Sequence, residues 1–218
     1  MVNSAKLEIR KNKILRAAEH VFGKKGFQDA TISEIAKKAK ISEASIYEYF
    51  STKEKLLFTI PTQYASDLFD LIEFHLKLIR GSGNKLRSII YLFISSYEER
   101  PDNAAIIMLL LKQNKKFLDT QGHLKIKKAL SVITETIDEG IKTGEFREDI
   151  NVYLVRSIII GTIEHLVTNW LMTGKPEKLI DLVDPLVDTV LEGIQSKKGP
   201  TSPLALIEAP LIENRLDE

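Results

Sequence analysis

The 218-residue chain contains no cysteine, a single tryptophan and only 7% aromatic residues. The missing thiols exclude disulfide bonds, thiolate metal sites and cysteine nucleophiles, and they fit a cytoplasmic location. The most apolar stretch, residues 152–172, is interrupted by Arg156 and Glu164, which argues against a membrane span. The N-terminus shows no signal-peptide pattern. We therefore expect a soluble, cytoplasmic protein.

Signatures of catalysis are also missing. The sequence has no HExxH, no GxSxG and no glycine-rich phosphate loop, and its four histidines lie far apart. We therefore expect no enzymatic activity, no metal and no cofactor. The chain does have 44% hydrophobic residues, which is ample for one small and one medium domain.

Charge is distributed unevenly along the chain. Residues 1–55 contain 12 Lys and Arg against seven Asp and Glu, whereas residues 56–218 contain 19 against 23. The net charge of +1 therefore combines a basic N-terminal segment with a mildly acidic remainder. The basic segment favours contact with phosphates, and the acidic remainder argues against a second nucleic-acid surface.

Two short helices joined by a tight turn are predicted within this basic segment, from Thr31 to Phe50. Thr31 and Glu34 fit a capping box, after which apolar residues recur at helical spacing. Lys40 begins the turn, and Ser42 is a good N-cap for the second helix. The pattern is typical of a helix-turn-helix that presents its second helix to the DNA major groove. The side chains expected to point away from the core are Ala44, Ser45, Tyr47 and Glu48.

Helices are also predicted on both sides of this motif. An amphipathic helix precedes it and ends near Gly26, where a left-handed cap is expected. A second capping box, Ser51 with Glu54, opens a further helix at Lys53. The runs ILRAAEHVFGKKGF, TISEIAKKAKIS and SIYEYFSTKEKLL together resemble the tetracycline-repressor (TetR/AcrR) family of bacterial transcription regulators.

The resemblance implies an all-α protein with an N-terminal helix-turn-helix DNA-binding domain and a C-terminal helical domain for ligand binding and dimerisation. It implies a homodimeric repressor that binds double-stranded DNA at a palindromic operator and is released by a small apolar effector. The expected domains are residues 1–55 and 56–197, followed by a proline-containing apolar tail, 198–218. The implied DNA-contacting residues are Thr31, Ser42, Glu43, Ala44, Ser45, Tyr47, Tyr49 and Lys53.

Two carboxylates, Glu43 and Glu48, depart from a purely phosphate-binding surface. Glu43 could accept a hydrogen bond from a cytosine amino group, or either acid could pair with a neighbouring lysine. An alternative without DNA binding is a helical dimeric adaptor protein. It would share the C-terminal bundle but need not carry Thr31, Tyr47 and Lys53 beside a basic patch.

The rest of the chain reads as helices. Pro61 interrupts the first of them and should kink it, so we expect bending there to transmit ligand binding to the DNA-binding domain. Pro185 in the last helix predicts either a kink or a fresh start with Asp184 as cap. The tail could lie along the body, lie across a partner subunit or be disordered. The expected helices are 53–79, 85–99, 101–118, 122–143, 152–172 and 177–195.

The last two helices carry more apolar surface than one pairing can cover, which predicts a dimer interface. The resemblance implies that they form a two-fold four-helix bundle; a monomeric core hairpin is the alternative. The expected interface residues are Ile159, Ile163, Trp170, Val183, Val187, Val190, Leu191 and Ile194.

The middle helices predict a largely apolar cavity with a few polar anchors. The C-terminal segment is also similar to the branch of the family that regulates fatty-acid metabolism and responds to long-chain acyl-CoA. That similarity implies acyl-CoA as the effector. The candidate ligand contacts are Tyr91, Tyr97, Met108, Gln113, Asn114, Phe117, His165 and Asn169.

Overall fold

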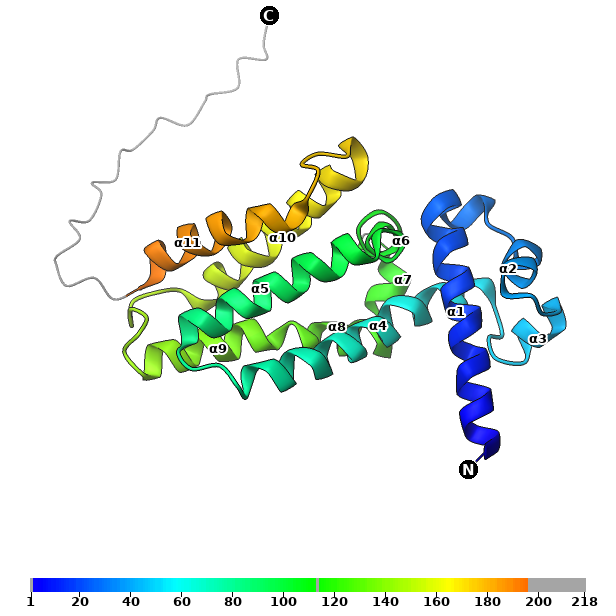
Figure 1. Ribbon diagram of the computed structural model, residues 1–218, viewed down its shortest axis with the longest axis horizontal. Coiled ribbons are helices and arrows are strands. Elements are labelled where there is room, and N and C mark those ends of the chain that lie inside the picture. The colour runs from blue at the N-terminus through cyan, green and yellow to red at the C-terminus, as the bar shows by residue number, and fades with distance from the viewer. Residues whose placement is uncertain (1, 113, 196–218) are drawn as a thin grey trace, which may run out of the picture.

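The computed structural model describes residues 2–112 and 114–195, with side chains from residue 6 onward. Gln113 and the tail 198–218, on which expectations were placed, lie outside the described residues. The described ranges are helical, as predicted, and contain no β-strand; a single isolated bridge joins Phe146 and Gln195. The helices form a small N-terminal head and an elongated helical body (Figure 1).

The head consists of the first helices of the chain and the start of the long helix that follows them. Gly26 interrupts the first helix with a φ of 75° and a ψ of 179°. The positive φ was expected, but the ψ is not that of a left-handed helical cap. The helices are α1 (Val2–Asp29), α2 (Ile32–Ala39), α3 (Glu43–Tyr47) and α4 (Lys53–Leu76).

Side-chain caps define the helix-turn-helix as predicted. The Thr31 hydroxyl accepts the Glu34 N–H at 3.2 Å, and the Glu34 carboxylate accepts the Thr31 N–H at 3.2 Å. The Ser42 hydroxyl accepts the Ser45 N–H at 3.2 Å. Between the two helices, Lys40 takes a left-handed conformation with a φ of 53°. The turn and both helix starts are therefore fixed by contacts within a few residues.

The start of α4 differs from the prediction. Thr52, not Ser51, is the cap: its hydroxyl accepts the Lys55 N–H at 3.0 Å. The reason is that α4 begins at Lys53, and the residue directly before a helix is the one whose hydroxyl reaches the third helical N–H. The helix continues through Pro61 as one element and ends at Leu76.

The body helices are more often interrupted than predicted. The expected helix 101–118 is divided by a π-helical turn and by Asn114, whose side chain caps the following helix. The expected helix 122–143 divides at Leu130, where the Ser131 hydroxyl bonds the Lys128 carbonyl at 2.7 Å and competes with regular helix bonding. The elements are α5 (Ser82–Glu99), α6 (Pro101–Ala105), the π-helical η1 (Ile106–Leu111), α7 (Lys115–Leu118), α8 (Gln121–Ala129) and α9 (Ser131–Lys142).

The last elements are α10 (Val152–Thr173), the 3-10 helix η2 (Leu179–Leu182) and α11 (Val183–Ile194). Asn151 caps α10 as its position predicts: the side chain accepts the Leu154 N–H at 3.0 Å. Pro185 lies at the start of a new helix and not at a kink within one. It lies in the first turn of α11, where backbone N–H groups lack helical acceptors, and Leu182 rather than Asp184 occupies the cap position.

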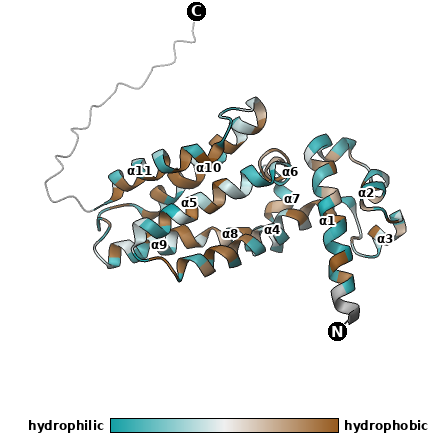
Figure 2. Ribbon diagram, viewed as in Figure 1, coloured by the Kyte–Doolittle hydropathy of each residue, from teal (hydrophilic) through white to brown (hydrophobic). Residues whose placement is uncertain are grey.

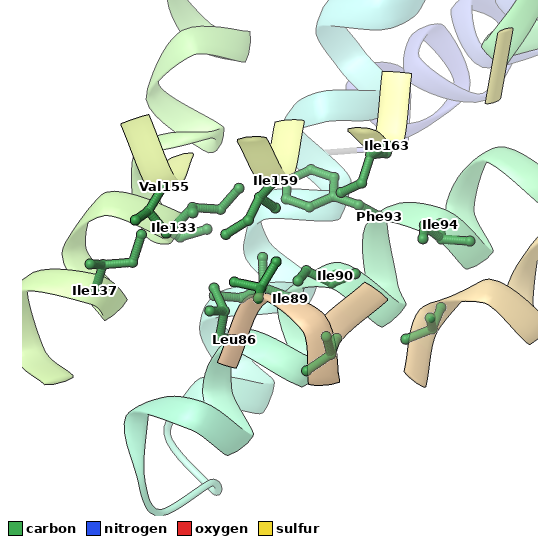
Figure 3. Close-up of a cluster of buried hydrophobic side chains, with 14 of the residues drawn as sticks. Leu86, Ile89, Ile90, Phe93, Ile94, Ile133, Ile137, Val155, Ile159 and Ile163 are labelled. Carbon is green, nitrogen blue, oxygen red and sulfur yellow. The ribbon is translucent and has the colours of Figure 1, made fainter. Parts of the chain in front are cut away.

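Two hydrophobic cores hold the molecule together. The body core joins residues of α5, α9, α10 and α11 (Figure 3). The head core joins α1, α2, α3 and the first turns of α4, and Figure 2 shows apolar residues in both parts of the molecule. Ile106, Leu111 and Phe117 belong to the head core although they follow α5 in the chain. The η1–α7 segment therefore binds the head to the body.

The head is anchored to the body where α1 crosses α6. A Cβ atom added to Gly23 would lie 2.7 Å from the Cα of Asp102, so the two backbones are in close contact. The Asp102 carboxylate lies 2.8 Å from His20 Nδ1 and 3.5 Å from Lys24 Nζ. Close packing and charge pairing thus position α1 on the body.

Candidate DNA interface and ligand cavity

The outward face of α3 carries side chains suited to contact a duplex. Tyr47 is 52% exposed, and Ser42, Glu43 and Ala44 are also exposed. Tyr49 is half-buried against the ring of Phe50, with ring centroids 6.4 Å apart. Short side chains at the start of α3 and the phenol of Tyr47 therefore share one open surface. Such a surface lets the helix backbone approach DNA closely while hydroxyls bind phosphates.

Ser45 does not belong to that open face. The expectation that it points outward is wrong, because its side chain is only 8% exposed. Its hydroxyl accepts a hydrogen bond from Arg10 at 3.3 Å and another from the Ser42 hydroxyl at 3.1 Å. Ser45 therefore ties α3 to α1, and a direct base contact from it remains a prediction.

Lys53 is held by the head rather than extended into solvent. Its ammonium donates to the Ala30 carbonyl at 2.8 Å and to the Gln28 carbonyl at 3.4 Å, and it lies 4.5 Å from the centre of the Phe27 ring. Its position at the first residue of α4 fixes this helix against the turn between α1 and α2. A phosphate contact by Lys53 would add to that role.

Arg10 is a candidate DNA contact that the sequence did not reveal. It lies on α1, yet its guanidinium reaches α3 at Ser45. The two residues are 35 positions apart, so only the crossing of the helices brings them together. Exposed Lys37, Lys38 and Lys40 add positive charge at the end of α2.

The carboxylates of Glu43 and Glu48 are exposed and make no ion pair with any residue in the described ranges. Pairing with a neighbouring lysine, one of the two explanations expected from the sequence, is therefore absent here. Glu34 behaves differently. A hydrogen bond from Lys25 and one from the Thr31 N–H lower the pKa of its carboxyl, so the capping box is stabilised by charge.

The body contains an apolar cavity of about 90 Å³ between α4, α5 and α8. Its wall includes Pro61 and Tyr64 of α4, Tyr97 of α5 and Glu164 of α10. A second space of about 30 Å³ shares Tyr97 and Glu164 with it. The remaining residues that line the larger cavity are Ala65, Leu68, Phe69, Ile72, Phe93, Ser96, Ile107, Ile126, Ala129 and Leu130.

Tyr97 is the one candidate ligand contact among the described residues that lines this cavity. Its phenol makes no hydrogen bond with any described residue, and burial together with the Glu164 charge raises its pKa. The phenol is therefore a neutral donor available inside the cavity. The Glu164 carboxylate is a hydrogen-bond acceptor in the same cavity wall, and the Lys112 ammonium pairs with it at 2.6 Å.

The structure places the other candidate contacts elsewhere. Met108 is buried in the body core, and Phe117 is buried in the head core against the Phe58 ring, at 5.2 Å. Asn114 is the cap of α7. Tyr91 is 49% exposed and lines an outer groove of about 700 Å³ between α5 and η2.

His165 and Asn169 share a helix face as predicted, but that face is exposed. Assigning them to the cavity is wrong, because inward positions of α10 are taken by Ile163 and Val167. The sequence showed that the two polar residues lie together but not which side of α10 faces the core.

A polar network beside the cavity links head and body. The Tyr64 hydroxyl donates to the Ser96 carbonyl at 3.1 Å, and the Arg100 guanidinium lies 4.4 Å from the centre of the Tyr64 ring. Arg100 also binds both carboxylate oxygens of Glu19 on α1. Burial raises the pKa of Tyr64. Tyr64 therefore forms part of the cavity wall and part of the head–body contact.

Most residues expected at a dimer interface instead build the core of the protomer. Figure 3 shows Ile159 and Ile163 pointing toward Phe93 of α5. Trp170 is partly buried against the same core. The protomer's own α5 thus covers this apolar stripe, so a partner subunit cannot pack against it. The other expected interface residues that are buried here are Val183, Val187, Val190, Leu191 and Ile194.

The opposite face of α10 is apolar and open. Leu154 is 55% exposed, Ile158 is 50% exposed and Met172 is 74% exposed. Gly161 lies on the same face, and a Cβ atom added there would meet nothing within 4 Å. This face continues through the exposed His165 and Asn169 noted above, so α10 presents a second stripe that the protomer does not cover.

Two other kinds of site were sought. Among the described residues, no group of three or more His, Asp or Glu side chains is arranged to hold a metal ion. No helix of the described ranges is long and apolar enough to cross a membrane.

Comparison with known protein families matches the chain in two parts. The profile described as "Bacterial regulatory proteins, tetR family" matches residues 14–60. The profile described as "YsiA-like protein, C-terminal region" matches residues 62–193. The two matches meet in α4, next to Pro61.

Proteins similar to this chain include regulators of fatty-acid metabolism. The fatty acid metabolism regulator protein of Bacillus subtilis is 28% identical over 184 residues, covering 84% of this chain and 95% of that protein. The structure of a transcriptional regulator FadR from Bacillus subtilis in complex with stearoyl-CoA is similar with a TM-score of 0.75 at 27% identity, covering 84% of this chain and 98% of that one. The fatty acid degradation regulator FadR from Bacillus halodurans gives a TM-score of 0.74 at 28% identity, covering 84% and 99%.

Proposed function

The chain belongs to the TetR family of bacterial regulatory proteins, and from that premise we propose that it is a homodimeric repressor released from its operator by a long-chain acyl thioester. The family makes it a DNA-binding transcriptional regulator, which supports DNA binding over the alternative of an adaptor protein. Its relatives are regulators and not enzymes. The proposal concerns the effector, the direction of control and the residues involved.

One observation carries the proposal: an apolar cavity shares a wall residue, Tyr64, with the contact that positions the head. The cavity lining is dominated by aliphatic and aromatic side chains, which suits a hydrocarbon chain. A regulator of similar sequence and fold is known in complex with stearoyl-CoA. These findings together favour an acyl chain as the occupant.

The size of the cavity explains why an occupant would change the structure. Its volume of about 90 Å³ is below the roughly 300–1,000 Å³ usual for ligand pockets. An acyl chain must therefore separate α4 from α8 to enter. This movement would displace Tyr64 and weaken the contact of Arg100 with Glu19, so the head would lose its fixed orientation. A ligand acts in this way only because it binds the altered arrangement more tightly.

Pro61 would localise the same movement. It lies inside α4, is buried and lines the cavity, and it removes the helix hydrogen bond to the Leu57 carbonyl. Pro61→Ala restores that bond and should raise the effector concentration for half-release about threefold, while DNA affinity stays within about twofold. An unchanged effector response in the release assay described below would contradict this role.

The outward stripe of α10 is proposed as the dimer interface in place of the buried stripe. Its exposed apolar residues and the open space at Gly161 suit close contact with the same helix of a second subunit. Such a two-fold pairing gives two heads at a fixed distance, as two operator half-sites one helical turn apart require.

The test begins with DNA, because the operator must be known first. Genomic fragments retained by the protein are sequenced, and a duplex carrying the recovered site is labelled for fluorescence anisotropy. Stearoyl-CoA is then titrated into the complex, with coenzyme A alone as the control. Release by stearoyl-CoA and not by coenzyme A is expected. Retention of no specific fragment, or equal retention with and without stearoyl-CoA, would refute the proposal.

A further inference from the structure

Residues 112–128 form the most basic part of the body. They contain six lysines and a single acid, Asp119, whereas the rest of residues 56–218 contains 13 Lys and Arg against 22 Asp and Glu. The overall acidity of the body therefore hides a local excess of positive charge. We refer to Lys112, Lys115, Lys116, Lys125, Lys127 and Lys128 as the lysine strip.

Most of the lysine strip is not neutralised within the protomer. All six lysines are exposed. Lys112 pairs with Glu164 at 2.6 Å and Lys116 pairs with Glu54 at 3.2 Å. The other four form no ion pair with any residue in 2–112 or 114–195. Like charges one turn apart destabilise a helix. Binding of an anion to the lysine strip would reduce this repulsion.

The lysine strip borders the apolar cavity. The helix α8 contributes Ile126 and Ala129 to the cavity wall, and Leu130 follows directly. Lys125, Lys127 and Lys128 lie on the outer side of the same turns. From the other direction, the Lys112 ammonium binds the Glu164 carboxylate, which also lines the cavity. The apolar cavity and the three exposed lysines of α8 are thus separated only by that helix.

We propose that the lysine strip is the docking site for the phosphate-bearing head group of the effector, whose acyl chain occupies the cavity. This inference rests on the proposed function and adds the place where the phosphate-bearing carrier of the thioester binds. A free fatty acid offers a single negative charge, next to the carboxylate of Glu164. A carrier with several phosphates instead places its charges against several exposed ammonium groups.

The test compares two thioesters that share an acyl chain. Stearoyl-CoA carries the phosphates, and stearoyl-pantetheine lacks them. Binding of each is measured by titration calorimetry at low and moderate salt, with the wild-type protein and two triple variants. One variant carries Lys125→Gln, Lys127→Gln and Lys128→Gln. The matched control makes the same charge change at exposed body lysines outside the strip, with Lys77→Gln, Lys142→Gln and Lys178→Gln.

The wild-type protein should bind stearoyl-CoA more tightly than stearoyl-pantetheine, and added salt should shrink the difference. The strip variant should lose about tenfold in affinity for stearoyl-CoA and stay within about twofold for stearoyl-pantetheine. The control variant should bind both thioesters like the wild-type protein.

Unchanged stearoyl-CoA affinity in the strip variant would overturn the inference and leave the proposed function standing. Weaker DNA binding by the strip variant, with unchanged stearoyl-CoA affinity, would overturn it in favour of a second DNA contact. A wild-type protein that binds neither thioester would refute the proposed function itself, and the docking site with it.

Discussion

The head and the body are both helical, but their helices are held in different ways. In the head, α2, α3 and α4 each begin at a hydroxyl cap, provided by Thr31, Ser42 and Thr52. In the body only some helices are capped in this way: α7, α8 and α10 begin at Asn114, Thr120 and Asn151. The body helices α5, η1 and α9 begin without any side-chain cap and are held mainly by burial. Two body irregularities, the π-helical turn and the break at Leu130, contribute to the cavity wall.

The difference shows where shape is fixed and where it can change. A cap fixes the direction of a helix through directional hydrogen bonds over a few residues. Burial is non-directional and depends mainly on the apolar area that is covered, so helices can shift while that area stays covered. We therefore expect the DNA-facing surface to move as a unit and the body to rearrange internally.

The largest expected loss of DNA binding by the head follows from a substitution at Lys53. In Lys53→Glu a carboxylate would face the Ala30 and Gln28 carbonyls, and the phosphate contact expected of Lys53 would be lost. We expect at least about a 100-fold loss of operator affinity, measured by anisotropy. Lys55→Glu is the matched control, since Lys55 is exposed and lies only two residues further along α4. Equal losses in the two variants would mean that net charge alone matters.

The dimer can be broken from the body without touching the head. In Ile158→Glu a charge enters the outward stripe of α10, whereas the side chain is 50% exposed and contributes little to the protomer core. We expect a monomer by light scattering and a loss of operator affinity of roughly 30-fold or more, because the two heads no longer bind together. A dimer of unchanged stability would place the interface elsewhere.

The connection between the two regions is tested at Arg100. In Arg100→Gln the ion pair with Glu19 and the stacking on Tyr64 are lost, while the caps of the head are untouched. We expect the effect of stearoyl-CoA on DNA affinity to fall about tenfold, with a smaller change in DNA affinity without effector. Arg87→Gln removes a similarly exposed arginine that pairs with Asp184 and Asp188, away from the head, and serves as the control.

The smallest expected effect concerns the cavity at high pH. Burial raises the pKa of Tyr97 in the folded protein, so its neutral form stabilises the fold below the unfolded pKa of about 10, and this stability is lost as pH rises further. Urea unfolding of the wild-type protein should show a greater loss of stability between pH 8 and pH 11 than unfolding of Tyr97→Phe, by about 1 kcal/mol. Identical losses would remove Tyr97 from this explanation.

The same contrast explains what the sequence could predict. The Thr31–Glu34 capping box and the caps Ser42 and Asn151 depend on residues three positions apart, and all were confirmed. The all-α fold and the helix-turn-helix follow from such local patterns. Helix breaks in the body were missed because competing side-chain hydrogen bonds, such as that of Ser131, override apolar periodicity.

The candidate site was predicted less well because it depends on tertiary contacts. An apolar residue such as Ile159 has the same pattern whether its own subunit or a partner covers it, and the structure shows the former. Arg10 meets Ser45 across 35 positions, and Arg100 meets Glu19 across 81. No spacing rule along the chain indicates such pairs.

The contribution of η1 and α7 to the head core has a consequence for transferring this DNA-binding head to other proteins. Ile106, Leu111 and Phe117 complete a hydrophobic core whose other fully buried members precede residue 61. A fragment cut at the apparent boundary near Lys55 would expose the surfaces that these side chains cover, and should aggregate or unfold. Chimeric sensors built from this protein should therefore join a foreign body to the head together with residues 106–117, or supply equivalent apolar side chains.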